Sequence, residues 1–186
     1  MRIIGGLRRG RALVAPAGQT TRPTADRVRQ ALFDMLLHAP WGGRSCVEGA
    51  HVLDAFAGTG ALGLEALSRG GASCHFMETD RSALQALRSN IAACGMEAQT
   101  RISTSDATAP PRAQTPCSLI FLDPPYRQDL PGRAMAALRR AGWIAPDALV
   151  VVETAADEAP PFDGDAVLAE RRHGAACLRI WRDPGI

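Results

Sequence analysis

The tetrapeptide Asp123-Pro124-Pro125-Tyr126 holds the residues best suited to chemistry in this chain of 186 residues. An exocyclic amine of a nucleobase is a poor nucleophile because its lone pair is delocalised into the ring. The Asp123 carboxylate and the Pro124 carbonyl, directed by the fixed φ of Pro125, can accept its two N–H bonds and localise that lone pair. Tyr126 offers a face on which an extruded base can stack. The pattern predicts methyl transfer to an amino nitrogen, with these four as the catalytic residues.

An ordinary turn is the alternative for this tetrapeptide. In that case Asp123 would form the turn after the apolar run 119–122, and Tyr126 would pack on the surface. The residues also leave two roles open for Asp123, which could take up the proton or only orient the amine.

A glycine cluster with the spacing Gly58-x-Gly60-x-x-Gly63 follows the apolar run 52–53. Glycine allows unusual dihedrals and lets a ligand approach the backbone, so we expect a cofactor loop here. The same spacing occurs in nicotinamide-binding proteins, so the glycines leave both cofactor classes open. Asp54 suits an ammonium group better than a pyrophosphate, which favours S-adenosylmethionine. The alternative is that Asp54 only caps the following helix.

Two further carboxylates follow predicted strands. Glu78 can accept both hydroxyls of a ribose, with Asp80 as a rival and a plain surface carboxylate as the alternative. Asp106 can accept from an adenine amino group, and the alternative is a turn-forming Asp106. The residues expected to bind the cofactor are therefore Asp54, Phe56, Ala57, Gly58, Thr59, Gly60, Glu78, Asp106 and Ala107.

The first 44 residues form a basic segment. They contain eight arginines and two acidic residues, a net charge of +6, whereas the whole chain carries +2 and residues 45–186 therefore carry −4. A cationic segment beside an acidic body is typical of a polyanion-binding appendage, because phosphate contacts supply most of the non-specific affinity for nucleic acids. A scattered, solvated charge surface is the alternative.

Short apolar runs alternate with helical patterns from residue 51 onward, which predicts an α/β sandwich with a mostly parallel sheet. Seven strands are expected, at 51–55, 74–79, 99–103, 118–122, 148–153, 166–171 and 176–182, the last two as an antiparallel hairpin. Helices are expected at 61–69, 81–94 and 129–141. Before them we expect a short hairpin or extended arm within 2–15 and a helix, N-capped by Thr24, that shows Arg27 and Arg29 away from its buried face. We divide the chain into an extension, 1–44, and a catalytic domain, 45–186.

The five cysteines are widely spaced and include no C-x-x-C pair, and the four histidines show no ligand spacing. We therefore expect reduced thiols, no metal site and a cytoplasmic protein. No apolar run is long enough for a signal peptide or a membrane span, so we expect no membrane partner.

Several segments, in the same order along the chain, resemble the RsmD family of bacterial 16S ribosomal RNA guanine-N2 methyltransferases. These are Arg2–Gly6 with Arg9–Arg11, Arg22–Thr24 with Asp26–Arg29, the glycine segment 53–70, and Asp123–Tyr126. The resemblance covers nearly the whole chain. It implies the Rossmann-like class I methyltransferase fold, in agreement with the seven predicted strands.

The resemblance also implies a cofactor and a substrate. The cofactor would be S-adenosylmethionine, leaving as S-adenosylhomocysteine, and the substrate a guanine N2 of 16S ribosomal RNA in an assembled or assembling small subunit. Residues implied to face the RNA are Arg2, Arg8, Arg9, Arg11, Arg22, Thr24 and Arg27, and we expect a monomer. Adenine-N6 enzymes share the tetrapeptide, so an adenine methyltransferase remains an alternative. So do a nicotinamide-dependent oxidoreductase and a non-catalytic RNA-binding protein on this fold.

Overall fold

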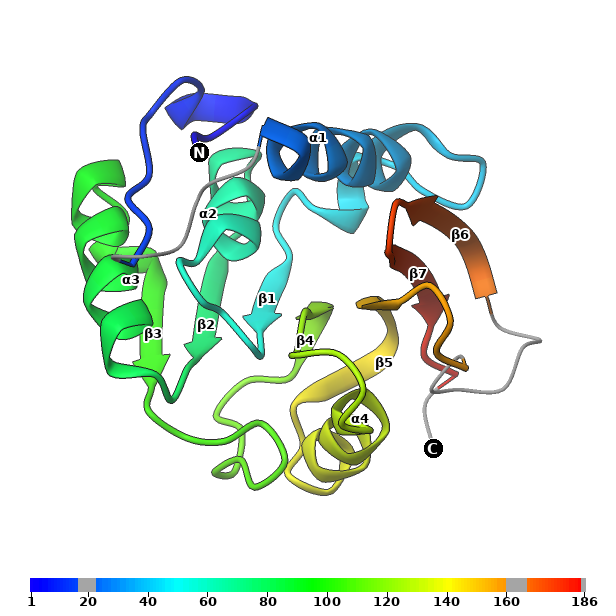
Figure 1. Ribbon diagram of the computed structural model, residues 1–186. Coiled ribbons are helices and arrows are strands. Elements are labelled where there is room, and N and C mark those ends of the chain that lie inside the picture. The colour runs from blue at the N-terminus through cyan, green and yellow to red at the C-terminus, as the bar shows by residue number, and fades with distance from the viewer. Residues whose placement is uncertain (17–22, 160–166, 185–186) are drawn as a thin grey trace.

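The computed structural model describes residues 1–16, 23–159 and 167–184, with the backbone alone for residues 23–25. Within these residues seven strands form one sheet in the order β3-β2-β1-β4-β5-β7-β6 (Figure 1). The strands are β1 His51–Asp54, β2 Ser73–Met77, β3 Thr100–Ser103, β4 Cys117–Leu122, β5 Ile144–Ala155, β6 Val167–His173 and β7 Ala176–Arg182. Neighbours among β1 to β5 pair in parallel, and β7 pairs antiparallel with β5 and β6. The predicted sheet and terminal hairpin are confirmed, although β5 is longer than expected.

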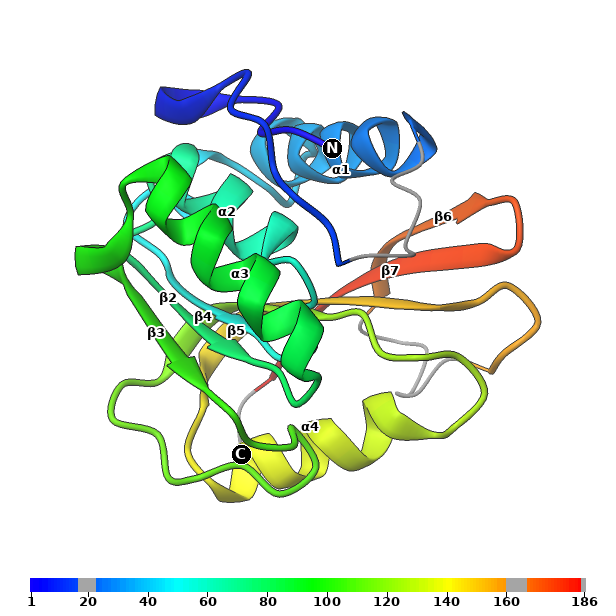
Figure 2. The ribbon, with the colours of Figure 1, turned by 60° about the vertical axis from the view of Figure 1, so that its left-hand side comes forward.

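The helices lie on both faces of this sheet. Helices α1 Pro23–His38, α2 Ala61–Ser68 and α3 Arg81–Cys94 cover one face, and α4 Leu130–Arg140 covers the other (Figure 2). Three short 3-10 turns, η1 Gly6–Arg8, η2 Arg44–Cys46 and η3 Glu97–Gln99, complete the described elements. The ends of α3 show why the sequence folds this way. Asp80 caps its first turn by accepting from the Ala83 N–H at 2.8 Å, and Gly95 ends it in the left-handed region at φ 60°.

Alternation along the central strands separates two cores. Leu119 and Phe121 of β4 pack beneath α1 and α2, whereas Ile120 and Leu122 pack against α4. Successive side chains of a strand point to opposite faces, so an uninterrupted apolar run fills both cores at once. Such a run is what places a strand in the middle layer of a three-layer sandwich.

The buried stripe of α1 differs from the prediction. Arg29, Leu32, Phe33 and Leu36 are buried at the spacing i, i+3, i+4, i+7, and Arg29 is only 4% exposed. The expectation that Arg29 lies away from the buried face is therefore wrong, while Arg27 is exposed as expected. The helix also begins at Pro23, one residue before Thr24, its predicted N-cap.

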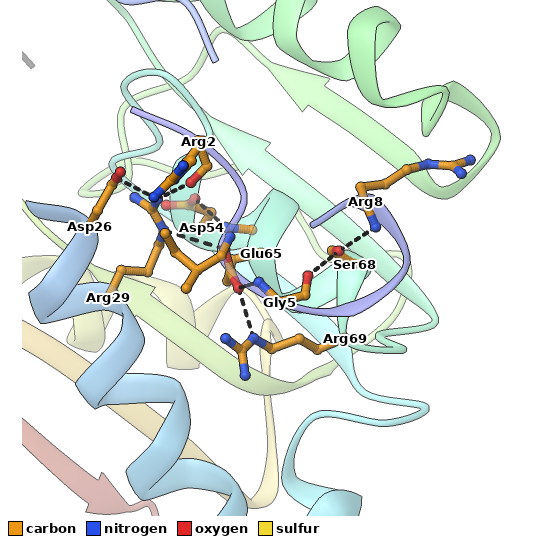
Figure 3. Close-up of polar contacts among 11 residues, drawn as sticks. Arg2, Gly5, Arg8, Asp26, Arg29, Asp54, Glu65, Ser68 and Arg69 are labelled. Atoms are coloured by element: carbon orange, nitrogen blue, oxygen red, sulfur yellow. Dashed lines mark hydrogen bonds and ion pairs between the residues drawn. The ribbon is translucent and has the colours of Figure 1, made fainter. Parts of the chain in front are cut away.

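The first fifteen residues form the expected hairpin, with Arg2 bridged to Ala12, and they pack onto α2 rather than standing free. Ile3 and Leu13 enter the core beneath α1 and α2. The fully buried Glu65 of α2 accepts the backbone N–H groups of Ile4 and Gly5, both at 2.8 Å (Figure 3). We call residues 1–15 the arm. The boundary at residue 44 stays a prediction.

Two arginines complete the surroundings of Glu65. Arg69 donates to one carboxylate oxygen at 2.8 Å, and Arg29 lies 3.5 Å from the other. Arg29 in turn donates to Asp26 at 2.9 Å and to the Arg2 carbonyl. A buried carboxylate needs such partners because an uncompensated charge is costly in a low dielectric. The network therefore fixes the arm, α1 and α2 to one another.

A second contact ties the arm to the glycine loop. The buried Asn90 of α3 accepts the Val14 N–H at 2.8 Å and donates to the Val14 carbonyl at 3.0 Å and the Thr59 carbonyl at 2.9 Å. One amide side chain thus uses its acceptor and both donors to join the arm to the loop between β1 and α2.

In the part of the chain that the structure describes, no helix has the length and apolar character needed to cross a membrane.

Replacing Glu65 should release the arm. We expect Glu65→Ala to lower the free energy of unfolding by about 3 kcal/mol, because two backbone N–H groups and two arginines lose their acceptor. Tryptic cleavage within the arm, at Arg8 or Arg9, should speed up. Urea denaturation and limited proteolysis measure the two effects.

Glu48→Ala is the matched control, since Glu48 pairs with Arg44 at 3.1 Å where both side chains are exposed. Its cost should stay below about 0.5 kcal/mol. Equal effects of the two substitutions would contradict the role assigned to Glu65.

Candidate active site

A cavity of about 590 Å³ opens at the carboxyl ends of β1, β4 and β5. It brings together several of the predicted residues: Asp54, Phe56, Ala57, Gly58, Thr59, Asp123 and Tyr126 all line it. Ligands of open α/β sheets bind at this edge, where the strand order reverses between β1 and β4. The cavity is therefore the candidate active site.

Asp54 has one carboxylate oxygen that is hydrogen-bonded within the fold and one that is not. The residue is 1% exposed, and its Oδ2 accepts the Gly63 N–H in the first turn of α2 at 3.0 Å. Its Oδ1 is buried without a hydrogen-bond partner among the described residues. Burial, opposed by the Gly63 hydrogen bond and aided by the Glu78 charge, raises the pKa of Asp54 to about 7. The helix-capping alternative therefore accounts for Oδ2 but not for Oδ1. Asp54 lines the cavity, and its Oδ1 is not used by the cap.

The glycine loop is shaped by two different demands. Gly58 and Gly60 are in the left-handed region, at φ 52° and 79°. A Cβ on Gly60 would lie 2.3 Å from Leu87, whereas a Cβ on Gly58 would meet nothing within 4 Å. Gly60 therefore serves packing as well as the turn, and it does not line the cavity. Gly58 leaves open space beside the cavity, as a loop approached by a ligand requires.

Glu78 extends from the end of β2 to the same loop. Its Oε2 accepts the Gly58 N–H at 2.7 Å, and its Oε1 accepts the N–H groups of Thr79 and Asp80, also at 2.7 Å. Glu78 is thus held against the loop and is more than a free surface carboxylate. Its rival Asp80 caps α3, and hydrogen bonds from Ser82 and Ala83 lower the pKa of Asp80. Ribose binding by Glu78 stays a prediction.

Asp106 and Ala107 do not line the cavity. Asp106 is exposed, and its Oδ1 accepts both the N–H and the hydroxyl of Thr108 at 2.8 Å, as a turn-forming aspartate does. Ala107 is buried on the α4 side of the sheet. The structure therefore shows the turn, and contact with an adenine stays a prediction.

Three carboxylates reach the cavity from three neighbouring strands. Asp54 ends β1, Asp123 follows β4, and Glu153 lies near the end of β5. The register pairs Leu122 with Val152, so Asp123 and Glu153 come next on adjacent parallel strands. Because side chains alternate along a strand, Asp123 points to the same face of the sheet as Phe121, which faces α1 and α2. The sheet thus gathers negative charge at one face of its carboxyl edge.

Asp123 lines the cavity and is exposed there. Its carboxylate accepts no hydrogen bond from a described residue, and its pKa is raised to about 8, first by burial and then by the charges of Glu153 and Asp54. Pro124 is buried beside it, whereas Pro125 is exposed, and neither proline lines the cavity. A carboxyl group of raised pKa inside a cleft is a candidate for proton chemistry.

Tyr126 is fixed by Glu153. Its hydroxyl donates to Glu153 Oε1 at 2.5 Å, and burial followed by this bond raises the pKa of the phenol. The residue as a whole is 40% exposed. The next residue, Arg127, donates its N–H to Glu158 at 2.5 Å, and its side chain lies 3.1 Å from Asp157. The loop after β4 is thus anchored to the segment after β5.

Sequence reasoning missed three residues with titratable side chains that line the cavity: Arg29, Glu153 and His173. Arg29 could have been found from its place on the apolar stripe of α1, and Glu153 from its place after the apolar run of β5, as Asp123 follows that of β4. His173 has a buried Nε2 without a hydrogen-bond partner among the described residues, and we see no sequence signal for it.

The arginines expected to face RNA are partly described. Arg2, Arg8, Arg9, Arg11 and Arg27 are exposed on the arm and on α1. Arg8 also donates to the Cys94 carbonyl at the end of α3, at 2.6 Å. Arg22 and the side chain of Thr24 lie outside the described residues. RNA contact by this set stays a prediction.

Among the described residues, no group of three or more acidic, histidine or cysteine side chains could hold a metal ion. The five cysteines are free thiols.

Residues 1–182 match the family described as Conserved hypothetical protein 95. The chain belongs to this family. Ribosomal RNA small subunit methyltransferase D of Escherichia coli K12 is 39% identical over 161 residues, which cover 87% of this chain and 78% of the relative. The resemblance to the RsmD family is thereby confirmed, and with it the prediction that the chain is a methyltransferase.

Solved structures agree on the fold. The structure of yhhF from Escherichia coli has a TM-score of 0.84 and 37% identity, and it covers 100% of this chain and 99% of its own. The 16S rRNA N2 G1207 methyltransferase RsmC of Thermus thermophilus, in complex with AdoMet and guanosine, has a TM-score of 0.66 and 18% identity, over 89% of this chain and 44% of its own. The second likeness shows the fold alone, and the class I methyltransferase fold is confirmed.

Asp54→Asn should stabilise the free protein in a pH-dependent way. The unfolded chain ionises Asp54 near its ordinary pKa of 3.8, but the folded protein ionises it only near pH 7. Between these values the folded state holds more protons, so wild-type stability falls as pH rises. The variant lacks this loss, so its advantage in unfolding free energy should grow from pH 4 to pH 7, reaching on the order of 2–4 kcal/mol.

Urea denaturation from pH 3.5 to pH 8.5 measures this difference, and the points below pH 4 serve as the internal control. A difference that stays constant across the range would contradict the burial of an ionisable Asp54 in this cavity.

Proposed function

We propose that this protein transfers the methyl group of S-adenosylmethionine to the exocyclic N2 of a guanine in 16S ribosomal RNA. The substrate would be an assembled or assembling small ribosomal subunit. The observation that carries the proposal is the joint placement of Asp54 and Asp123 in one cavity beside the glycine loop, where neither Asp54 Oδ1 nor the Asp123 carboxylate accepts a hydrogen bond from a described residue. The relative named as a small-subunit ribosomal RNA methyltransferase supports the choice of RNA.

The residues present fit the cofactor. Asp54 Oδ1 is a buried acceptor to which no described residue donates, which suits the ammonium of the methionine end, and the cation would make the ionised form of Asp54 favourable. Among the described residues, Glu78 Oε2 accepts one hydrogen bond, from the Gly58 N–H, and keeps capacity for a ribose hydroxyl. Asp106 and Ala107 would meet the adenine. When bound, S-adenosylmethionine supplies a methyl group already activated by a sulfonium.

The tetrapeptide would prepare the amine. Asp123 accepts one N–H of the guanine amino group, the Pro124 carbonyl accepts the other, and Tyr126 supports the ring of the base. These contacts turn the nitrogen lone pair out of the ring and toward the methyl group, so most of the rate comes from proximity and orientation. The nitrogen must then lose a proton. The raised pKa of Asp123 makes this carboxylate a competent acceptor near neutral pH.

The basic surface would hold the RNA. The exposed arginines of the arm and α1 supply charge for phosphate contacts, which favour binding independently of sequence. We further propose that the protein acts in the cytoplasm as a monomer. Asp54 argues against a nicotinamide cofactor, since a buried carboxylate beside the loop would oppose a pyrophosphate.

Methyl transfer to small ribosomal subunits tests the proposal. Subunits purified from a strain that lacks the endogenous enzyme should accept one labelled methyl group, and nucleoside mass spectrometry should find N2-methylguanosine. N6-methyladenosine would instead support the adenine alternative, and no transfer would sink the proposal. Calorimetry should show binding of S-adenosylhomocysteine, weakened by Asp54→Asn by about tenfold or more, and no comparable binding of NAD.

The rate should depend on the ionised form of Asp123. Because only the carboxylate can accept the amine N–H without competition from its own proton, kcat/KM should rise with pH and level off above about 8, the pKa of Asp123. Asp123→Asn should lower kcat/KM by about 100-fold or more across the range. A profile flat from pH 6 to pH 9 would show that Asp123 is ionised throughout.

A further inference from the structure

Glu153 lines the cavity but takes no direct part in the methyl transfer proposed for Asp123, Pro124 and Tyr126. It lies on β5, half-buried, on the strand next to that of Asp123. Glu153 lies two residues after Val151 and so points to the same face of the sheet, beneath α1 and α2. Glu153 therefore reaches the cavity from the same face as Asp123. Neighbouring strands are about 4.8 Å apart, which lets two such carboxylates address adjacent atoms on the edge of one base.

One oxygen of Glu153 is available for a ligand. Oε1 accepts the Tyr126 hydroxyl at 2.5 Å, and Oε2 accepts no hydrogen bond from a described residue. Tyr126 thereby also holds the carboxylate in one orientation, with a hydroxyl donor on one oxygen. The neighbouring Asp123 likewise accepts none. The cavity thus presents acceptors from two adjacent side chains beside the ring on which the base would stack.

Guanine and adenine differ at the atom that such an acceptor would meet. On guanine, N1–H and the N2 amino group are neighbouring donors on one edge. On adenine, N1 is an acceptor, so its lone pair would face a carboxylate and both would stay unpaired. A site built to accept a hydrogen bond strongly disfavours an analogue that lacks the donor, because buried polar groups are left unsatisfied.

We propose that Glu153 accepts the N1–H of the target guanine while Asp123 accepts from the N2 amino group, so that Glu153 selects guanine over adenine. The inference rests on the proposed function in one respect, which is that the base enters this cavity. It assigns base choice to a residue outside the tetrapeptide, which is shared by enzymes that act on different bases.

A purely positioning role is the competing explanation, since Glu153 also holds Tyr126. Tyr126→Phe separates the two because it removes the hydroxyl bond and keeps the Glu153 carboxylate. If Glu153 reads N1, the Phe variant retains the base preference and Glu153→Gln loses it. If Glu153 only holds Tyr126, both variants change base binding alike.

Nucleoside binding provides the test, measured by calorimetry or NMR titration on the full-length protein saturated with S-adenosylhomocysteine. The probes are guanosine, adenosine, inosine and 2-aminopurine riboside. Inosine keeps N1–H but lacks the 2-amino group, whereas 2-aminopurine keeps the amino group and has an acceptor at N1. The wild-type protein should bind guanosine and inosine about tenfold or more tightly than 2-aminopurine riboside and adenosine.

Glu153→Gln should lower the ratio of guanosine to 2-aminopurine riboside affinity about tenfold, because its amide can donate to an N1 acceptor. Glu153→Ala should weaken guanosine without strengthening 2-aminopurine riboside. Circular dichroism of each variant verifies folding.

The outcomes separate the two levels of the proposal. A wild-type protein that prefers adenosine would overturn both the proposed function and the role of Glu153. A preference for guanosine that survives Glu153→Gln, or that Tyr126→Phe abolishes equally, would overturn only the role of Glu153. Failure of the wild-type protein to bind any of the four nucleosides would also overturn it, since a cavity that reads a base edge must hold the free nucleoside.

Discussion

The order of the parallel strands concentrates acidic groups at one place, and the rest of the site follows from it. Adjacent strands β1, β4 and β5 end at the same edge, and pleating directs Asp54, Asp123 and Glu153 to the same face. Burial raises the pKa of both Asp54 and Asp123, and the charge of Glu78 adds to the shift of the first and those of Glu153 and Asp54 to the shift of the second, so their ionised forms are costly. A sulfonium with an ammonium group, and an amine rich in N–H donors, would each relieve that cost.

Beneath the arm, by contrast, a buried carboxylate is surrounded by hydrogen-bond donors and positive charge. Glu65 is as buried as Asp54, but it accepts two backbone N–H groups and has Arg29 and Arg69 beside it. The two carboxylates differ, since both oxygens of Glu65 have partners within the fold, whereas Asp54 Oδ1 has none among the described residues. A fully partnered buried charge orders its neighbourhood, whereas an unpartnered one marks a place for a ligand.

Much of this arrangement could be predicted from the sequence, and the failures have physical causes. Strand ends such as Asp54 and Asp123 follow apolar runs, so period and position locate them without three-dimensional information. Arg29 was misplaced because an arginine on an apolar stripe reads as solvated until a buried partner such as Glu65 is known. Glu153 follows an apolar run just as Asp123 does, but pairing between β4 and β5 is non-local, and only the register shows that the two residues adjoin. Asp106 was ambiguous in the sequence, and the hydrogen bonds of Thr108 show a turn.

Asn90 is hydrogen-bonded to both Val14 and Thr59, and this affects how the activity of N-terminally shortened forms of the protein should be interpreted. Residues 1–15 contribute Ile3 and Leu13 to the core and close a bond network that ends on the glycine loop. Deleting these residues would leave a cavity in the core and remove the Val14 partners of the buried Asn90 amide. It would thereby weaken a contact that holds the glycine loop, besides removing four arginines. Loss of activity in such a shortened protein would therefore say little about RNA affinity, and charge-neutral side-chain replacements on an intact backbone are the informative alternative.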